Sequence, residues 1–357
     1  MAGFLARLWT GFAIRCMQFF WSGVVMMGLV WRWLTVGSSL YTTKDHKLPD
    51  KLLKYNHKYI ELPSGIRMHY VEEGDENAPM MVFVHGYPEF WYTWRYQIDH
   101  FKKNFRVVAI DQRGYGDSDK PKECAAYHID LLARDLDLLI HALGYEKAVV
   151  VGHDWGGAVV WRHALHYPSS VERLIVMNCP HPAVFGDMLK THPEQMKKSW
   201  YVFMFQTPYL PEYVIAAEDY KMLQQMFWGK NGGMRNKGNM TEEDMEAWKY
   251  TFSRPGALTP PLNYYRCSIQ YPVGGKQREK CKPKTLIIWG DGDAFLVKEG
   301  GVQSPKWCED GRVEFLEGAS HWVQQDVPDR VNELMQDFLA DLPRPIPHSP
   351  KENNPHL

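Results

Sequence analysis

Short apolar runs rich in β-branched and aromatic residues recur along the chain at intervals that suit strands. Strands are predicted at residues 58–62, 66–73, 80–85, 105–111, 147–152, 171–179, 284–290 and 312–316. Between several of them apolar residues recur with helical spacing, notably over 125–143 and 155–167. The alternation predicts an α/β fold with a mostly parallel sheet and helices on both faces.

This alternation stops between residues 180 and 270. No strong strand pattern occurs there, while amphipathic stretches such as 241–252 recur among prolines, which favours an inserted helical lid. We therefore expect the core of the fold in two parts, 58–179 and 271–342, with the lid at 180–270 between them. The tail at 343–357 is rich in Pro, Ser, Lys and Asn and is predicted to be disordered.

The first 41 residues form a separate apolar piece, joined to the core by a polar linker at 42–57. No charged residue occurs from Cys16 to Trp31, and Arg15 and Arg32 bracket this run. At about 1.5 Å per residue the run covers roughly 24 Å, so Arg32 would have to snorkel for the following residues to complete a span of roughly 30 Å. A single-pass membrane anchor at 1–41 is the prediction, with the endoplasmic reticulum as the expected membrane. Cleavage of a signal peptide after Gly37 and an interfacial helix are the alternatives.

The composition of the chain argues against nucleic acid as a partner and against a zinc site or a disulfide framework. The formal net charge is −1 and 23% of residues are charged, which leaves no electrostatic footprint for nucleic acid. The six cysteines are scattered, without the short paired spacings of a zinc site or a small disulfide framework. We expect no metal, no organic cofactor and no obligate protein partner.

The side of the membrane on which the core lies stays open. Asn239-Met240-Thr241 has the pattern of an N-glycosylation acceptor, in a glycine-rich stretch expected to be an exposed lid loop. Glycosylation of Asn239 would place the core on the lumenal side of the membrane. The absence of a disulfide pattern favours the cytosolic side.

The most informative motif follows the strand at 147–152. There the chain breaks into Gly152-His153-Asp154-Trp155-Gly156 and then into a helical pattern. This is the pattern of a nucleophile elbow, a sharp strand-to-helix turn whose flanking glycines leave room where Cβ atoms would clash. The nucleophile position holds Asp154. A carboxylate forms an ester with an electrophilic carbon, and water must then cleave that ester, so the chemistry points to epoxide opening or halide displacement.

A second motif, His85-Gly86-Tyr87-Pro88, follows the strand at 80–85. A glycine-containing turn in this place can direct backbone N–H groups at a developing negative charge. The N–H groups of Tyr87 and Trp155 are therefore predicted to form an oxyanion hole, while His85 is expected to be structural.

Two further polar residues follow later strands. Asp293 comes after the strand at 284–290 and His321 after the strand at 312–316. The order nucleophile, acid, histidine is that of an α/β hydrolase. Asp293 would orient the imidazole of His321, which would act as the general base toward water. Asp291 is the alternative acid, and Asp293 is preferred because it directly precedes an apolar run.

Five segments, which together lie within residues 58–340, occur in an order typical of one family. They are His85-Gly86-Tyr87-Pro88-Glu89-Phe90-Trp91, Asp111-Gln112-Arg113-Gly114-Tyr115-Gly116-Asp117-Ser118-Asp119, Gly152-His153-Asp154-Trp155-Gly156, Pro261-Leu262-Asn263-Tyr264-Tyr265-Arg266 and Ser320-His321-Trp322. In this order they resemble the α/β-hydrolase-fold epoxide hydrolases, in particular a membrane-anchored branch similar to the C-terminal domain of soluble epoxide hydrolase.

The resemblance implies two lid tyrosines that donate protons to the opened epoxide. Tyr265 matches one by its place before Arg266, and Tyr201 matches the other by its spacing to Phe205-Gln206. A phenol with a pKa near ~10 stays protonated at neutral pH and can donate. The expected reaction converts lipophilic epoxides to vicinal diols.

Two alternatives remain on the sequence alone. A haloalkane or haloacid dehalogenase would use the same Asp154 and His321, although many haloalkane dehalogenases have asparagine where this chain has Tyr87. A non-catalytic scaffold of this fold that binds a lipid or a partner is the other alternative.

Overall fold

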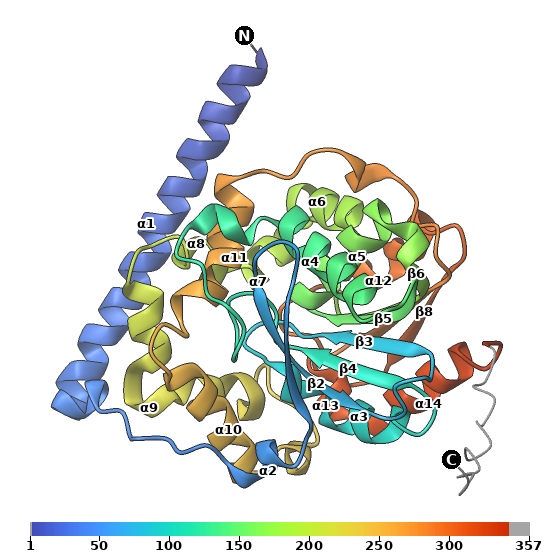
Figure 1. Cartoon of the computed structure of the whole chain (residues 1–357). Coiled ribbons are helices and arrows are strands. Elements are labelled where there is room, and N and C mark those ends of the chain that lie inside the picture. The colour runs from blue at the N-terminus through green and yellow to red at the C-terminus, as the bar shows by residue number, and fades with distance from the viewer. Residues whose placement is uncertain (1, 343–357) are drawn as a thin grey trace, which may run out of the picture.

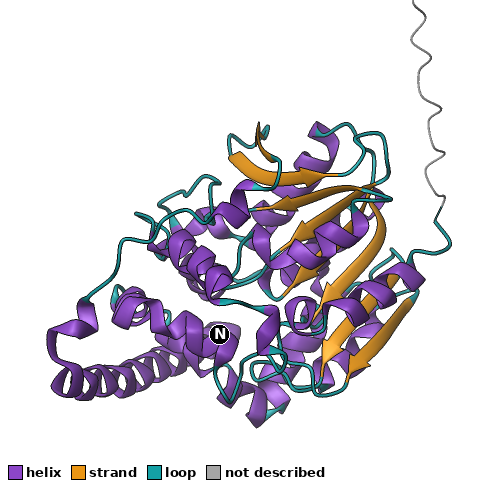
Figure 2. Cartoon of the chain, turned by 90° about the horizontal axis from the view of Figure 1, so that it is seen from below, coloured by secondary structure: helices purple, strands orange, loops and turns teal. Residues whose placement is uncertain are grey.

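A twisted central sheet organises the computed structural model, which describes residues 2–342, with side chains from residue 11 onward (Figures 1 and 2). Its eight strands lie in the order β1-β2-β4-β3-β5-β6-β7-β8. β2 is antiparallel to both β1 and β4, and all the other pairs are parallel. The strands are β1 His57–Glu61, β2 Arg67–Glu73, β3 Met80–Val84, β4 Arg106–Ile110, β5 Ala148–His153, β6 Val171–Met177, β7 Thr285–Gly290 and β8 Gly311–Leu316.

Every predicted strand is present, with ends that differ by two residues or fewer. The predicted helix at 125–143 was wrong at its start, because α4 begins only at Ile129 after a 3₁₀ turn over Cys124–Tyr127. His128 has an extended backbone, with ψ of 135°, and its ring caps the helix by accepting from the N–H of Asp130 at 3.3 Å, so the helix begins after this residue. The pattern of apolar residues continues through the 3₁₀ turn and conceals this boundary.

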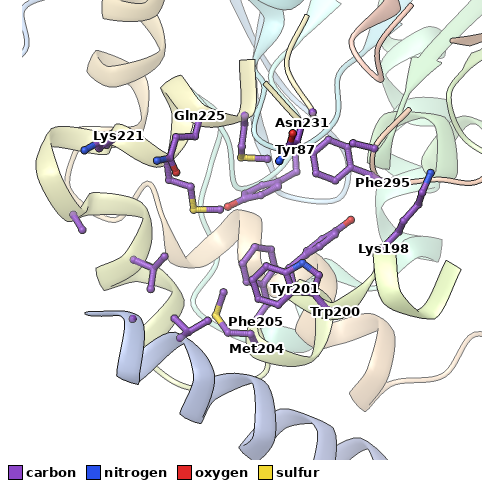
Figure 3. A pocket seen from close by; sticks show the side chains of 18 of the residues that line it. Tyr87, Lys198, Trp200, Tyr201, Met204, Phe205, Lys221, Gln225, Asn231 and Phe295 are labelled. Atoms are coloured by element: carbon purple, nitrogen blue, oxygen red, sulfur yellow. The ribbon is translucent and has the colours of Figure 1, made fainter. Parts of the chain in front are cut away.

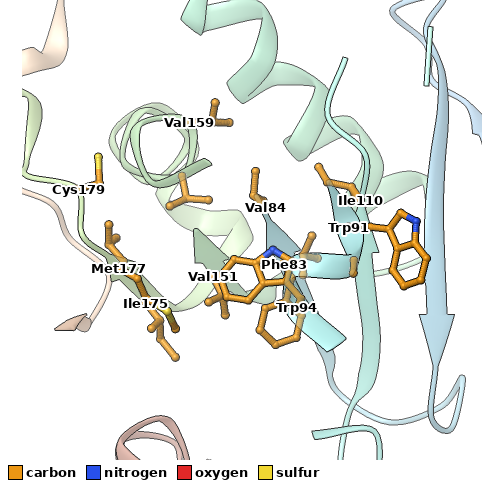
Figure 4. Packing of buried hydrophobic residues seen from close by; sticks show 14 of the residues in the cluster. Phe83, Val84, Trp91, Trp94, Ile110, Val151, Val159, Ile175, Met177 and Cys179 are labelled. Carbon is orange, nitrogen blue, oxygen red and sulfur yellow. The ribbon is translucent and has the colours of Figure 1, made fainter. Parts of the chain in front are cut away.

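The central strands are buried on both faces, as continuous apolar runs in a parallel sheet require. β3 and β5 are buried along their whole length. Phe83 packs against Trp94 with ring centroids 4.9 Å apart, and Val151 lies beside this pair (Figure 4). In Figure 1, α4, α5, α6 and α12 lie above the sheet, and α3, α13 and α14 lie below it. These helices are α3 Arg95–Phe101, α4 Ile129–Ala142, α5 Trp155–His166, α12 Glu299–Gln303, α13 Val323–Asp326 and α14 Pro328–Phe338.

The chain between β6 and β7 forms helices, apart from an isolated β-bridge from Cys281 to Cys308. We keep the name lid for the predicted residues 180–270, which contain six α-helices of this segment. Its helices are α6 Pro182–Thr191, α7 Pro193–Lys198, α8 Trp200–Met204, α9 Leu210–Trp228, α10 Glu242–Ser253 and α11 Thr259–Gln270.

Helix α9 is interrupted within its length. Glu218, Asp219 and Tyr220 adopt left-handed backbone angles, with φ of 51°, 58° and 60°. Such angles are unfavourable for residues with a Cβ atom, so neighbouring contacts must hold the break.

A long apolar helix precedes the core. Helix α1 spans Ala2–Val36 and continues as a 3₁₀ turn over Gly37–Tyr41. Residues Gly11–Tyr41 are long and apolar enough to cross a membrane, a property shared by membrane anchors and signal sequences. In Figure 1 the lower half of α1 runs beside α8 and α9, while its upper half extends past the body of the protein. The short helix α2, Asp50–Leu53, lies between α1 and the sheet in sequence.

Two expectations outside the core have different outcomes. The predicted disordered tail at 343–357 lies outside the described residues. The expected loop at Asn239 is a 3₁₀ turn, Lys237–Asn239, in which Lys237 and Gly238 are exposed and Asn239 is half-buried. The Asn239 amide donates to the carbonyl of Asp326 at 3.0 Å, so the folded protein does not present this amide freely to solvent.

Candidate active site

Asp154 occupies a strained turn between β5 and α5. Its φ of 51° and ψ of −120° lie outside the regions that residues with a Cβ atom ordinarily adopt. Gly156 makes this turn possible, because a Cβ atom there would overlap the carbonyl oxygen of Val84. The turn has the geometry of a nucleophile elbow with an aspartate at its tip.

The carboxylate of Asp154 faces the two groups that its proposed chemistry requires. Its Oδ1 accepts from the N–H of Tyr87 at 2.8 Å, and its Oδ2 lies 3.5 Å from Nε2 of His321. The turn approaches so closely that a Cβ atom on Gly86 would lie 2.5 Å from the Cβ of Asp154. Trp155 is the first residue of α5, so its N–H has no acceptor within that helix. Of the two predicted N–H donors, that of Tyr87 therefore contacts the carboxylate, and that of Trp155 belongs to the next residue, at the start of α5.

The geometry separates the two candidate acids. Asp293 Oδ2 accepts from Nδ1 of His321 at 2.7 Å and from the amide of Asn178 at 2.7 Å. Asp291 instead accepts from the N–H of Gly318 at 2.6 Å and pairs with Lys298. Of these two acids, Asp293 is the one placed to orient the imidazole.

The electrostatics of the site suit a histidine that changes protonation during the reaction. Burial lowers the pKa of His321, but the carboxylates of Asp293 and Asp154 outweigh burial and raise it to about 10. The histidine is therefore protonated at neutral pH in the resting site. Esterification of Asp154 would remove one of the two negative charges, so the pKa of His321 would fall and the imidazole could then accept a proton from water.

The two lid tyrosines line the same cavity as Asp154, which has a volume of about 960 Å³. Figure 3 shows Tyr201 in this cavity. Tyr201 comes from α8 and Tyr265 from α11, and their ring centroids lie 5.9 Å apart. Burial raises the pKa of both phenols above the ordinary value, so both keep their protons at neutral pH. The other residues that line this inner part of the cavity are mostly apolar and include Met204, Phe205, Phe295 and Trp322.

His85 has the surroundings of a structural residue. Its Nδ1 donates to the carbonyl of Gly86 at 2.8 Å, and its Nε2 accepts from the N–H of Gln112 at 3.1 Å. Burial lowers the pKa of His85, consistent with a neutral ring that accepts through Nε2. Both nitrogens are occupied by backbone groups and neither is free for a substrate.

A buried polar network beneath the site was not predicted from the sequence. Glu89 is completely buried, and its Oε2 accepts from the N–H of Gly86 at 2.9 Å and from Nδ1 of His153 at 2.8 Å. Nε2 of His153 donates to the carbonyl of His321 at 2.9 Å, and the amide of Gln324 donates to Oε1 of Glu89 at 2.8 Å. Burial raises the pKa of Glu89, but His153 and the other hydrogen-bond donors outweigh it and lower the pKa to about 2. A lone carboxylate between Pro88 and two aromatic residues was the signal available in the sequence.

The described residues contain no group of three or more His, Cys, Asp or Glu side chains that could hold a metal ion. The chemistry proposed below uses the side chains and backbone groups already described.

The fold and the strained aspartate define the class of protein first. Residues 79–205 match the alpha/beta hydrolase fold family, in which the nucleophile stands on an elbow of this kind. At the tip of its elbow this chain has an aspartate, whose carboxylate can serve as a nucleophile.

Comparison with known proteins gives the particular family. The chain is 42% identical over 345 residues to Caenorhabditis elegans epoxide hydrolase 2, a match that covers 96% of this chain and 97% of the relative. It is 43% identical over 291 residues to human epoxide hydrolase 4, covering 81% and 80% of the two chains. The crystal structure of a mutant epoxide hydrolase from Bacillus megaterium, complexed with its diol product, superposes with a TM-score of 0.72 at 32% identity and covers 79% of this chain and 100% of that one. The chain therefore belongs to the epoxide hydrolase family of the α/β hydrolases.

Proposed function

We propose that the protein converts lipophilic epoxides to vicinal diols through an ester on Asp154. The observation that carries this proposal is that one carboxylate shares its cavity with two sets of groups. The phenols of Tyr201 and Tyr265 line the cavity, and the imidazole of His321, itself bonded to Asp293, lies beside Asp154.

In the first step an oxygen of Asp154 attacks one epoxide carbon and the bond from that carbon to the ring oxygen breaks. The ring oxygen accepts a proton from Tyr201 or Tyr265, which yields a neutral hydroxyalkyl ester and a phenolate. Hydrogen bonds from both phenols would stabilise the negative charge as it develops on the ring oxygen.

Once Asp154 is esterified, the protonated His321 of the resting site returns its proton to the phenolate, which leaves a neutral imidazole. In the second step this imidazole takes a proton from water and the resulting hydroxide adds to the ester carbonyl. The N–H groups of Tyr87 and Trp155 stabilise the tetrahedral oxyanion. Its collapse breaks the bond between the carbonyl carbon and the diol oxygen, and that oxygen takes the proton of the newly formed carboxyl group, so that His321 ends the cycle protonated as in the resting site. The carboxylate of Asp154 returns with one oxygen from water.

The apolar surroundings of the site support a lipophilic substrate. Phe205, Phe295 and Trp322 line the cavity next to the reacting groups. We propose that α1 retains the enzyme at a membrane, that of the endoplasmic reticulum, in a single pass. The division into an anchor at 1–41, a linker at 42–57, a two-part core and a lid at 180–270 is part of the same proposal.

A panel of aliphatic and aryl epoxides tests the proposal directly. Diol formation by the full-length protein, lost in Asp154→Asn, is the expected result. Halide release from haloalkanes without diol formation would favour a dehalogenase, and no turnover of either class would favour a binding protein.

The neighbouring aspartates supply a matched pair of variants. Asp293→Asn should lower kcat by about 10²- to 10⁴-fold, because the imidazole loses the carboxylate that orients it. Asp291→Asn, which alters the same loop but not the bond to His321, should stay near the original rate. Equal losses in the two variants would contradict the assigned role of Asp293.

A further inference from the structure

One face of α1 contacts the lid along several turns. Ser22 and Gln18 both reach Thr207, at 2.6 Å and 3.3 Å, and the ring of Trp21 lies 5.1 Å from that of Trp200. The contacting residues recur every three or four positions, which places them on one stripe of the helix. The uncharged part of α1 therefore packs beside the lid.

Ion pairs fix the end of this stripe to the break in α9. Arg32 donates through two nitrogens to Glu218, at 2.6 Å and 2.5 Å. Just after α1, His46 contacts Asp219 at 2.8 Å, and the N–H of Lys44 donates to the same carboxylate at 3.0 Å. Two consecutive residues of the strained break are thus bound to the N-terminal segment. A bidentate arginine pair fixes geometry as well as distance, so α1 is held at a defined place on the lid.

The same stripe forms part of the cavity that contains the candidate active site. Val25, Gly28, Leu29 and Arg32 line one cavity together with Asp154 and His321. In Figure 3 the blue ribbon of α1 runs along the lower edge of this cavity, facing Met204 and Phe205. At Gly28 the wall carries no side chain, and a Cβ atom there would meet nothing within 4 Å. The cavity is therefore open beside α1.

The opposite face of α1 is apolar and exposed. Phe19, Met27, Trp31 and Leu34 are each about two-thirds or more exposed. No acidic residue occurs over Gly11–Tyr41, and this stretch satisfies the length and composition of a membrane span. A helix that has one face toward a cavity and an opposite apolar face suited to hydrocarbon would lie between the cavity and the lipid bilayer.

We propose that α1 is the outer wall of the substrate entrance, and that lipophilic epoxides pass from the bilayer into the cavity between α1 and the lid, over Gly28. This inference rests on the proposed function for the identity of the substrate. It gives the N-terminal helix a role in substrate selection in addition to any anchoring role.

Two glycines of α1 provide a matched test in full-length protein reconstituted into phosphatidylcholine vesicles. Gly28→Phe fills the entrance, whereas Gly23→Phe adds the same side chain to an exposed position outside the cavity. The measured quantity is the ratio of kcat/KM for 1,2-epoxyhexadecane to that for styrene oxide. This ratio should fall about ten-fold in Gly28→Phe and stay constant in Gly23→Phe. Equal ratios in the two variants would overturn the proposal.

Photolabelling separates the entrance from the reaction. Asp154→Asn protein in the same vesicles is irradiated with a hexadecyl diazirine, and the adducts are mapped by mass spectrometry. Excess 1,2-epoxyhexadecane should reduce adducts on the inner residues Val25 and Leu29 but not on the outer residues Val24 and Val30. Competition at Val25 and Leu29, together with no epoxide turnover by the unaltered protein, would retain the entrance and reject the proposed function. Diol formation by the unaltered protein, with no such competition, would reject the entrance and retain the proposed function.

Discussion

Replacement of His321 by glutamine should separate the two chemical steps. Nε2 of His321 lies 3.5 Å from Asp154 Oδ2 and is the group assigned to activate water. A general base contributes about 10²- to 10⁴-fold, which corresponds to roughly 3 to 5 kcal/mol of the barrier to ester hydrolysis. Attack by Asp154 uses the carboxylate and the two phenols, so this first step should stay within about ten-fold of its original rate.

The consequence is an enzyme trapped as its ester. If the two steps have similar rates in the unaltered enzyme, slowing the second by about 10²-fold leaves more than roughly 90% of the variant esterified at steady state. The tryptic peptide 148–162, which contains Asp154, should gain the mass of one intact epoxide. A haloalkane would add its mass less that of the hydrogen halide.

Two controls make this result decisive. Asp154→Asn should give no adduct, provided that its mass shows no deamidation to aspartate. His141→Gln, on the exposed surface of α4, should turn over normally and accumulate nothing. An unmodified peptide from folded His321→Gln protein, under conditions where the unaltered enzyme forms diol, would refute the ester and favour direct attack by water.

The lid phenols, the charge on His321 and the packing of the elbow each give a further prediction. Tyr265→Phe keeps the apolar ring and removes the hydroxyl, so epoxide turnover should fall by about 10²-fold, and the double change with Tyr201→Phe should be nearly inactive; unchanged turnover in both would remove the phenols from the mechanism. The pKa of His321, raised to about 10 in the folded protein, should fall in Asp154→Asn, which an NMR titration of the imidazole would measure. Because the folded-state pKa of His321 exceeds the usual ~6.5, the stability that this residue contributes is complete below about pH 6.5 and is lost as the pH rises through about 10. Urea unfolding measured over a series of pH values should therefore show that this stability is lost at a lower pH in Asp154→Asn than in the unaltered protein. Gly156→Ala should lower the free energy of unfolding by about 3 kcal/mol or more, because its Cβ would meet the Val84 carbonyl. Gly186→Ala, in the open interior of α6, should instead raise the free energy of unfolding by about 0.5–1 kcal/mol. Similar stabilities of the two variants would contradict the close packing at the elbow.

Much of the core was predictable because its strands are buried on both faces and so appear as uninterrupted apolar runs. The elbow was predictable for a different reason: its backbone admits only glycine at positions such as Gly156, and that requirement leaves a fixed spacing in the sequence. Asp293 and His321 were found because both follow the ends of neighbouring parallel strands, which meet at one edge of the sheet.

The remaining parts of the site depend on contacts between remote residues. Tyr201 and Tyr265 were identified only through resemblance, since tyrosines on lid helices carry no local signature of proton donation. The network of Glu89 joins residues from three separate segments, and the contact between Gln18 and Thr207 spans 189 positions. Gln18 and Ser22, polar and four residues apart in an apolar helix, were the local sign that one face of α1 has a partner.

The buried carboxylate of Glu89 has a consequence for how this enzyme can diversify. It joins the turn that carries Tyr87 to the loop that carries His321, so the groups proposed to hydrolyse the ester are connected by hydrogen bonds within the core. The phenols proposed to open the ring, and the proposed substrate entrance, come instead from α8, α11 and α1. On this assignment, inherited changes in those helices would alter which epoxides are accepted and leave the hydrolytic half of the cycle as it was in the ancestor.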